Sequence, residues 1–140
     1  MMSIVFDVPL DPKGKGRPRF SRQGKFTKVY TDQATLDYET AIQLCARKAM
    51  GSQSPLEAPV SVYLYIRVPI PKSYSKKRTE DCLSGLERPA KKPDIDNIAK
   101  AFLDAMNGTV YLDDTQVVVL NITKVYSAVP GVDVAIMEVE

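Results

Sequence analysis

The sequence predicts a single-domain α+β protein, in which a mixed or antiparallel β-sheet carries its helices on one face. Three observations predict this class. Alternating apolar residues indicate strands, apolar residues at helical spacing indicate two helices, and the elements follow the order β-α-β-loop-α-β-β-β over 140 residues. A chain of this length fits one domain, residues 1–140, with its own hydrophobic core.

The first half of the chain is predicted to place a strand and a basic segment before a long helix. Residues 3–8 alternate around β-forming side chains. Residues 9–30 are rich in proline, glycine and basic residues, which favours a loop or an irregular hairpin. A helix is expected over about 32–50, with Thr31 as its N-cap and Gly51 as its stop.

The second half is predicted to hold one more helix among several strands. Residues 60–68 show the clearest alternation in the chain. Residues 71–93 are polar and form a long loop with room for a short helix. A helix is expected over 95–107, with Asp96 as its N-cap. Further strands are expected at about 109–112, 116–126 and 132–139.

The chain contains no histidine, which excludes several kinds of active site. Ser-His-Asp and Cys-His machinery, HExxH metal sites and imidazole general bases all require that side chain. The two cysteines, Cys45 and Cys82, cannot fill a four-thiolate zinc site. An enzyme of this composition must therefore use carboxylates, lysines, hydroxyls or a hard metal ion.

The same composition favours a cytoplasmic protein with reduced thiols. The first 16 residues lack the pattern of a signal peptide, and no stretch approaches the apolar length of a membrane span, so no membrane partner is expected. The glycines of Lys13–Arg17 match neither the dinucleotide fingerprint nor the P-loop, so no nucleotide cofactor is expected. These glycines instead favour a tight turn or a close approach of the backbone.

The net charge of +2 conceals a strong sorting of charge along the chain. Residues 13–28 and 71–93 hold 14 of the 19 basic residues, and the first of these segments contains no acid. Such loops suit a polyanion, because neutralised phosphates release counterions. The alternative is that these side chains only keep exposed loops soluble. The residues predicted to bind the DNA backbone are Lys13, Lys15, Arg17, Arg19, Lys76, Lys77, Arg78, Lys91 and Lys92.

Two pairs of aspartates follow the second basic loop. Asp94 and Asp96 stand two residues apart and face the same side if the chain is extended before the helix starts. Asp113 and Asp114 come after the helix, and a returning strand would bring them back near its start. The alternatives are ordinary ones, since Asp96 can be a cap, Asp94 a favourable charge at a helix N-terminus, and the later pair turn residues.

Converging carboxylates repel one another unless a cation neutralises them. Oxygen ligands select a hard ion, so the sequence predicts Mg²⁺, with Mn²⁺ as a substitute. Lys100 lies one turn after Asp96, where it can hold a phosphate or simply form an i,i+4 ion pair. A metal site beside phosphate-binding loops predicts metal-assisted hydrolysis of phosphodiesters.

The segment KPDIDNIAKAFLDAMNGTVYLDDTQVVVL closely resembles the signature of the RusA family of Holliday-junction resolvases, small homodimeric endonucleases often found on prophages. The upstream KGRPRF, Lys15 to Phe20, resembles that family's N-terminal segment. The resemblance implies a RusA-like α+β fold and catalytic, metal-binding roles for Asp94, Asp96 and Asp114, with Asp113 beside them. It also implies that Lys100 is the catalytic lysine.

The expected activity is therefore a Mg²⁺-dependent endodeoxyribonuclease that resolves four-way junctions during recombination and repair. The expected partners are branched DNA and a second copy of the chain, because opposed strands require two equivalent sites. Three alternatives remain open. They are a branched-DNA-binding protein without catalysis, a structural or regulatory protein whose acids are caps and turns, and a nuclease with another branched or single-stranded substrate.

Overall fold

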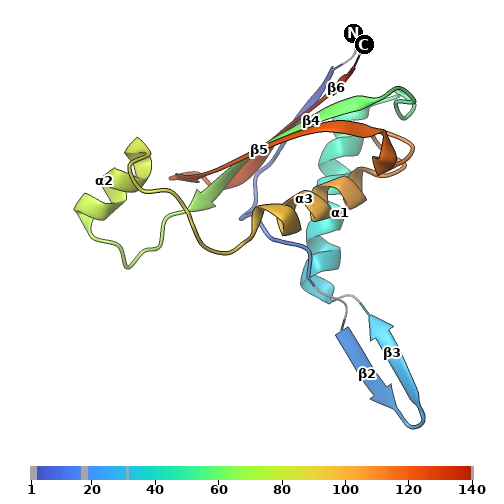
Figure 1. Ribbon diagram of the computed structural model, residues 1–140, viewed down its shortest axis with the longest axis horizontal. Coiled ribbons are helices and arrows are strands. Elements are labelled where there is room, and N and C mark those ends of the chain that lie inside the picture. The colour runs from blue at the N-terminus through green and yellow to red at the C-terminus, as the bar shows by residue number, and fades with distance from the viewer. Residues whose placement is uncertain (1–2, 17–18, 31, 140) are drawn as a thin grey trace.

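A four-stranded sheet with two helices on one face forms the body of the molecule (Figure 1). The computed structural model describes residues 3–16, 19–30 and 32–139. In chain order the elements are β1 (Ser3–Val8), β2 (Arg19–Gln23), β3 (Phe26–Tyr30), α1 (Gln33–Met50), β4 (Val60–Pro69), α2 (Lys76–Ser84), α3 (Ile95–Met106), the 3₁₀ helix η1 (Asp114–Gln116), β5 (Val117–Ser127) and β6 (Gly131–Glu138). The predicted α+β class is confirmed.

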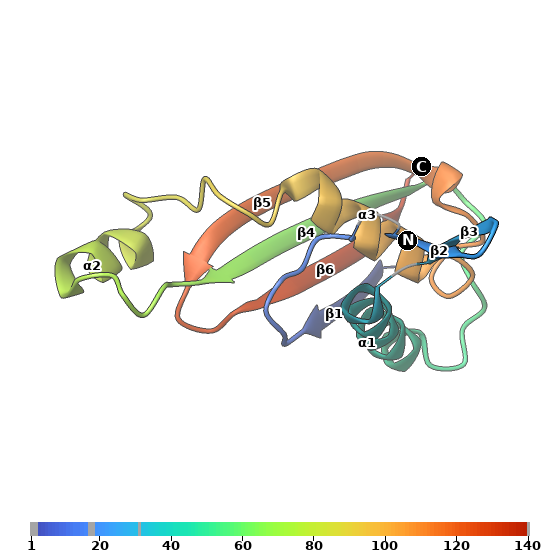
Figure 2. The same cartoon turned by 90° about the horizontal axis from the view of Figure 1, so that it is seen from below.

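The sheet has the strand order β1-β6-β4-β5 and is mixed. β1 and β4 each run antiparallel to β6, whereas β4 and β5 are parallel neighbours. Parallel neighbours cannot be joined by a tight turn and need a long crossover. The crossover from β4 to β5 contains α2 and α3, and it lays α3 across the sheet beside α1 (Figure 2).

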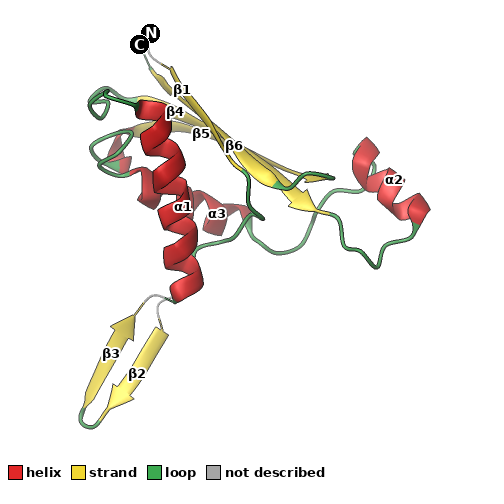
Figure 3. Ribbon diagram, turned by 180° about the vertical axis from the view of Figure 1, so that it is seen from behind, coloured by secondary structure: helices red, strands yellow, loops and turns green. Residues whose placement is uncertain are grey.

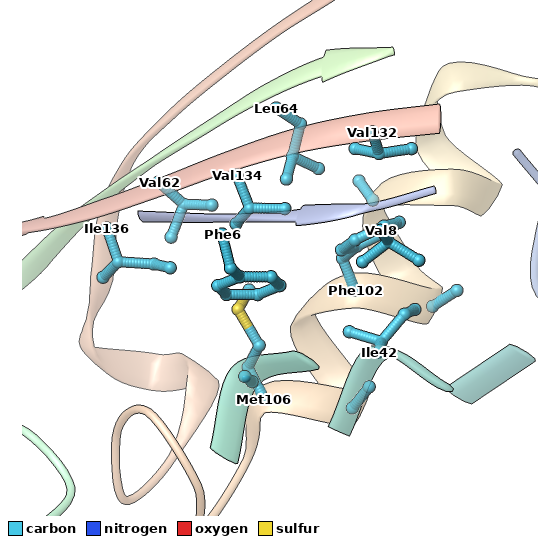
Figure 4. Close-up of a cluster of buried hydrophobic side chains, with 14 of the residues drawn as sticks. Phe6, Val8, Ile42, Val62, Leu64, Phe102, Met106, Val132, Val134 and Ile136 are labelled. Carbon is cyan, nitrogen blue, oxygen red and sulfur yellow. The ribbon is translucent and has the colours of Figure 1, made fainter. Parts of the chain in front are cut away.

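The core lies between this sheet and the two helices, where apolar side chains from both layers meet (Figure 4). Alternation along the strands puts every second residue of β1, β4 and β6 into this layer. Phe102 of α3 packs edge-on against Tyr38 of α1, with ring centroids 5.9 Å apart. The contact fixes the two helices against each other, so the core determines where α3 begins.

The ends of α1 follow local capping chemistry. The N-cap is Asp32, whose carboxylate accepts a hydrogen bond from the Thr35 N–H at 2.8 Å. The predicted cap, Thr31, lies outside the described residues. Gly51 ends the helix as predicted, with φ of +60° and its N–H donating to the Arg47 carbonyl. Within the described ranges, no helix is long and apolar enough to cross a membrane.

The predicted strand at 109–112 is wrong. Gly108, with φ of +75°, turns the chain directly after α3. Val110 and Tyr111 are then fully buried in a turn, and the Tyr111 hydroxyl donates to the Leu103 carbonyl at 2.8 Å. Two of the apolar residues that suggested a strand, Val110 and Tyr111, are therefore buried in this turn, and Tyr111 forms only isolated bridges instead of pairing in the sheet.

Two parts of the chain project from the body (Figure 3). The basic segment before α1 forms the β2–β3 hairpin, which pairs only within itself among the described strands. The long loop after β4 contains α2, the short helix for which the sequence left room. The two projections belong to the two basic segments that the sequence singled out, residues 13–28 and 71–93.

The start of β5 is held by one glutamine. The Gln116 side-chain amide donates to the carbonyls of Leu56 and Ala58, at 2.8 and 2.9 Å. Its carbonyl oxygen accepts from the N–H groups of Leu112 and Asp113, at 2.8 and 3.0 Å. Four hydrogen bonds from one side chain join the turn after α3 to the segment that leads into β4.

Replacing this side chain tests that role. Gln116→Ala leaves backbone groups of two segments without partners, so we expect the free energy of unfolding to fall by about 2 kcal/mol. Urea unfolding followed by circular dichroism measures the change. Gln53→Ala is the matched control, because Gln53 is exposed and its side chain makes no hydrogen bond within the described part of the chain. Equal midpoints for the two variants would contradict the assignment.

Candidate active site

A groove of about 490 Å³ opens between three segments that lie far apart in the sequence. One wall is the glycine-rich segment Pro12–Gly16, and the opposite wall is the chain around the start of α3, which contributes Asp94 and Asn97. The first turn of α1 completes the lining. Lys13 and Lys92 also border the groove, and so does Asp32 of the α1 N-cap, so basic and acidic residues line the same opening.

The glycines of this segment let the backbone pack closely against the starts of α1 and α3, whereas their expected approach to a phosphate stays a prediction. A Cβ atom on Gly14 would lie 2.8 Å from the Cβ of Asn97. A Cβ atom on Gly16 would overlap the Asp32 carboxylate and lie 2.6 Å from the Thr35 hydroxyl oxygen. The backbone uses this proximity, since the Gly16 N–H donates to the Thr35 hydroxyl at 3.0 Å. No larger residue fits at either position without moving the loop.

Lys15 anchors the same loop to both helices. Its N–H donates to the Asn97 carbonyl at 3.0 Å. Its ammonium group lies 2.6 Å from an Asp104 oxygen on α3 and 3.1 Å from a Glu39 oxygen on α1. Partial burial acts to lower the Lys15 pKa, but the hydrogen bonds and charges of Asp104 and Glu39 outweigh it and raise the pKa. The ammonium group already has two anionic partners, so Lys15 acts first as an anchor for the loop.

The start of α3 presents its acids to solvent. Asp94 is the N-cap residue, with extended backbone angles and no capping hydrogen bond from its side chain. The prediction that Asp96 is the cap is therefore wrong, because the helix begins at Ile95 and Asp96 lies in its first turn. Both aspartates are exposed. The requirement that Asp94 precede the regular helix is met, and its carboxylate is not consumed by capping.

A lysine that the sequence analysis missed supports this segment from the sheet. The half-buried Lys124 of β5 donates to the carbonyl of Lys91 at 2.7 Å and to that of Pro93 at 3.0 Å. The peptide bond before Pro93 is cis, directly before Asp94. The only sequence signal for this support is a single lysine inside an otherwise uncharged strand. Lys124 thus holds the backbone that leads into the acidic helix start.

Lys100 lies one turn along α3 from Asp96 and is exposed. The i,i+4 ion pair that the spacing allows is not formed, since no ion pair joins Lys100 to an acid among the residues that the structure describes. Its ammonium group therefore remains available to a phosphate oxygen at this helix surface.

The second acidic pair, Asp113 and Asp114, follows α3 in the chain and lies beside a different part of that helix. Asp113 caps η1 and accepts a hydrogen bond from the Thr115 hydroxyl at 2.7 Å, which lowers the Asp113 pKa. Burial raises the pKa of Tyr111, and the charges of Asp114, Asp104 and Asp113 add to that effect. Because Tyr111 bonds near the end of α3, this pair lies beside the second half of the helix.

The expected return of this pair to the start of α3 is not seen within the described ranges. Asp94 and Asp104 are ten residues apart along the helix, about 15 Å at the usual rise. No group of three or more acidic or cysteine side chains placed to hold a metal occurs among the described residues. The buried turn that replaces the predicted strand at 109–112 explains this difference, because it leaves the chain near the end of the helix.

Several cations of the α2 region have partners within the chain. The Arg78 guanidinium lies 3.6 Å from the centre of the Tyr74 ring and donates to both Glu87 oxygens, at 2.9 and 3.1 Å. The Lys91 ammonium lies 5.4 Å from the same ring, and Lys77 pairs with Asp81. The exposed Lys76 and Lys92 form no such ion pair in the part of the chain that is described. Arg17 and the side chain of Arg19 lie outside the described residues.

Together, the fold and the groove define a small α+β domain whose basic glycine-rich loop faces a carboxylate at the start of a helix. That combination suits a protein that handles phosphate groups. Comparison with known proteins gives the family. The model of the family described as endodeoxyribonuclease RusA matches residues 9–137. The chain therefore belongs to the RusA endodeoxyribonuclease family.

A curated relative covers the chain almost completely. It is an uncharacterized protein, YqaN of Bacillus subtilis (strain 168), which is 39% identical over 142 residues. The match spans 99% of this chain and 99% of the relative.

Removing the anchoring charge tests the construction of the groove. Lys15→Met separates the loop from α1 and α3 and leaves two carboxylates facing each other, so we expect a loss of about 1–2 kcal/mol in unfolding free energy. Folding raises the Lys15 pKa, so its contribution is complete below the unfolded-state pKa and is lost as the pH rises through the folded-state value.

Urea unfolding of both proteins at neutral pH and at a pH above the raised Lys15 pKa checks this sign. The control is Lys48→Met, because Lys48 is exposed and has no ion pair within the described ranges. A stability difference between wild type and Lys15→Met that persisted unchanged at the higher pH would exclude the ion pairs as its source.

Proposed function

We propose that the protein is a Mg²⁺-dependent endodeoxyribonuclease that resolves Holliday junctions by paired nicks in opposed strands. The observation that carries this proposal is the groove, because it sets Asp94 opposite a basic loop in a chain of an endodeoxyribonuclease family. A phosphodiester needs cationic groups to bind its charge and an activated water to cleave it. Lysines at the borders of the groove would supply the cationic groups. Carboxylates that can hold a metal ion would supply the activated water.

The acids at the start of α3 suit a hard divalent ion. Asp94 and Asp96 are exposed, neither caps the helix with its side chain, and the chain offers no histidine that would favour a softer metal. Mg²⁺ commonly takes only one or two carboxylates and completes its shell with waters and phosphate oxygens. The bound ion, or Mn²⁺ in its place, supplies an activated water and neutralises phosphoryl charge.

We also propose metal-binding roles for Asp114 and, beside it, Asp113. Their position beside the second half of α3 separates them from Asp94 within one chain. For the two pairs of aspartates to bind metal at one site, they would have to lie closer together than they do in the described residues of a single chain. Asp113 already caps η1, which makes Asp114 the more available ligand of the two.

The basic residues divide into those that bind phosphate and those that build the binding surface. Lys100 would contact the scissile phosphate, because it lies exposed one turn from Asp96 and has no ion pair with any residue that the structure describes. Lys13 and Lys92 border the groove and would contact the flanking backbone. Lys15 and Arg78, which are engaged by acids, would keep the two basic segments in shape. Contacts of this kind read DNA shape rather than base sequence.

A second candidate function is branched-DNA binding without cleavage, or cleavage with a different substrate preference. The observation that favours it is the absence of a three-acid group among the described residues. A pure binding protein is indifferent to EDTA, whereas the proposed nuclease is not. Comparison of four-way, flap and single-stranded substrates separates the remaining nuclease alternatives.

We propose that the protein acts as a homodimer, and β5 is the surface that best suits a second copy. β5 is an edge strand of the sheet, and its first half exposes Val118 at 58%, Val119 at 43% and Leu120 at 43%. A long edge strand whose first half carries exposed apolar side chains and no charge readily pairs with another chain. Pairing two copies across a two-fold axis would supply two equivalent sites for opposed strands.

Neutralising one acid tests the catalytic proposal. Asp94→Asn removes a metal ligand and a negative charge beside the DNA, so we expect cleavage of a synthetic four-way junction in Mg²⁺ to fall more than about 100-fold. Binding of the same junction should be unchanged or tighter. A gel assay with labelled strands measures cleavage, and fluorescence anisotropy without divalent metal measures binding.

The matched control is Asp37→Asn, which makes the same charge change at an exposed position of α1 outside the groove lining. It should retain cleavage within about threefold, because no ligand is removed. Wild-type cleavage rates for Asp94→Asn would rule out this aspartate as a metal ligand.

A charge on the β5 edge tests the dimer. Val118→Lys places a cation where two β5 strands would meet, so we expect the variant to sediment as a monomer under conditions in which wild type is a dimer. Val5→Lys is the control, since Val5 is 68% exposed on β1, at the opposite edge of the sheet. Dimers for both variants would place the interface elsewhere.

A further inference from the structure

The β2–β3 hairpin projects from the body of the molecule (Figure 1). Its aromatic side chains are exposed. Phe20 is 71% exposed and Phe26 is 79% exposed, and Val29 and Tyr30 are also largely open to solvent. The loop between the strands is tight, with Gly24 at φ of +60°. Among the described strands, β2 and β3 pair only with each other.

An isolated hairpin with exposed aromatic side chains is typical of a surface that binds another molecule. An isolated two-stranded hairpin is at best marginally stable in water, because it has no layer against which to bury a face. Exposed phenylalanines increase that cost and are common where another molecule binds. The core of the protein does not need these side chains, since the residues that fill it come from the four-stranded sheet, α1 and α3.

The charges on the hairpin identify the chemistry of the partner. Arg22, Lys25 and Lys28 are exposed, and residues 13–28 contain no acid at all. A second copy of the same hairpin would be repelled, whereas a polyanion would be attracted. The strand register puts Phe20 and Arg22 on one face of the ribbon and Phe26 and Lys28 on the other. Each face therefore combines an aromatic ring with a cation.

We propose that the β2–β3 hairpin binds DNA bases that are not stacked in a continuous duplex, with Phe20 and Phe26 as stacking surfaces and the three cations on neighbouring phosphates. Paired bases inside a duplex are closed to an aromatic ring, whereas bases at a branch point or in a single strand are accessible. The inference rests on the proposed function, because a four-way junction offers such bases at its centre.

The aromatic residue of the second basic segment, Tyr74, is less open to a base. Tyr74 has the Arg78 guanidinium over its ring and lies edge-on to Tyr126, so intramolecular contacts already occupy it. Phe20 and Phe26 are open, and basic residues alternate with them. The hairpin would thus add recognition of unstacked bases to the backbone contacts made at the groove.

The test uses four-way junctions that carry 2-aminopurine at the branch point, together with linear duplexes, in the absence of divalent metal. We expect wild type to raise the 2-aminopurine fluorescence and to prefer the junction. Phe26→Leu and Phe20→Leu keep an apolar side chain but remove the aromatic face. They should lower junction affinity about 10-fold each and reduce the fluorescence change, with duplex affinity within twofold of wild type.

Three controls separate stacking from charge and from folding. Phe26→Tyr keeps a ring and should retain the fluorescence change. Val29→Ala removes an exposed apolar side chain of the same hairpin and should bind as wild type does. Lys25→Ala should weaken junction and duplex binding alike and lower the slope of log affinity against log salt by about one.

Each contrary outcome has a distinct meaning. Wild-type junction binding and fluorescence in both leucine variants would overturn the stacking role while leaving the proposed nuclease intact. Loss of dimer sedimentation in these variants, with the fluorescence change preserved, would overturn it in favour of a contact between copies of the chain. A wild-type protein that fails to bind or cleave the junction would instead contradict the proposed function on which the inference rests.

Discussion

The ion pairs of Lys15 are the constraint on which the site depends. One ammonium group joins the glycine-rich loop to Glu39 of α1 and Asp104 of α3, three segments that the sequence separates widely. Gly14 and Gly16 make this possible, because side chains there would collide with Asn97 or with the start of α1. Without the anchor, the basic loop would have no fixed relation to Asp94, and the groove would lose one wall.

The order of the strands in the sheet determines where α3 lies. β4 and β5 are parallel neighbours, so the chain between them must cross over, and that crossover delivers α3 to the inner face. Lys124 of β5 then holds the carbonyls of Lys91 and Pro93, which fixes the backbone entering the helix. The acids at the helix start are thereby exposed on a backbone held by hydrogen bonds, which suits the metal-binding role proposed for them.

Local sequence patterns predict most of the strands and helices of this molecule. They do not predict the contacts between residues that lie far apart in the sequence. Alternation located the strands of the large sheet, and the 71–93 segment was expected to have room for the helix now seen as α2. The strand expected at 109–112 failed because Tyr111 is buried against α3, a contact that no local rule signals. The partners of Lys15 and Lys124 lie too far along the chain to be inferred from spacing. The sequence named the acids but could not show that Asp113 and Asp114 lie beside the far half of the helix.

We propose that this groove supports metal-dependent cleavage of branched DNA. Cleavage of an immobile four-way junction, with each strand labelled in turn, in Mg²⁺ and in EDTA tests this proposal. We expect nicks at matching positions in two opposed strands in Mg²⁺ and none in EDTA. Tight junction binding with no cleavage in either Mg²⁺ or Mn²⁺ would contradict it.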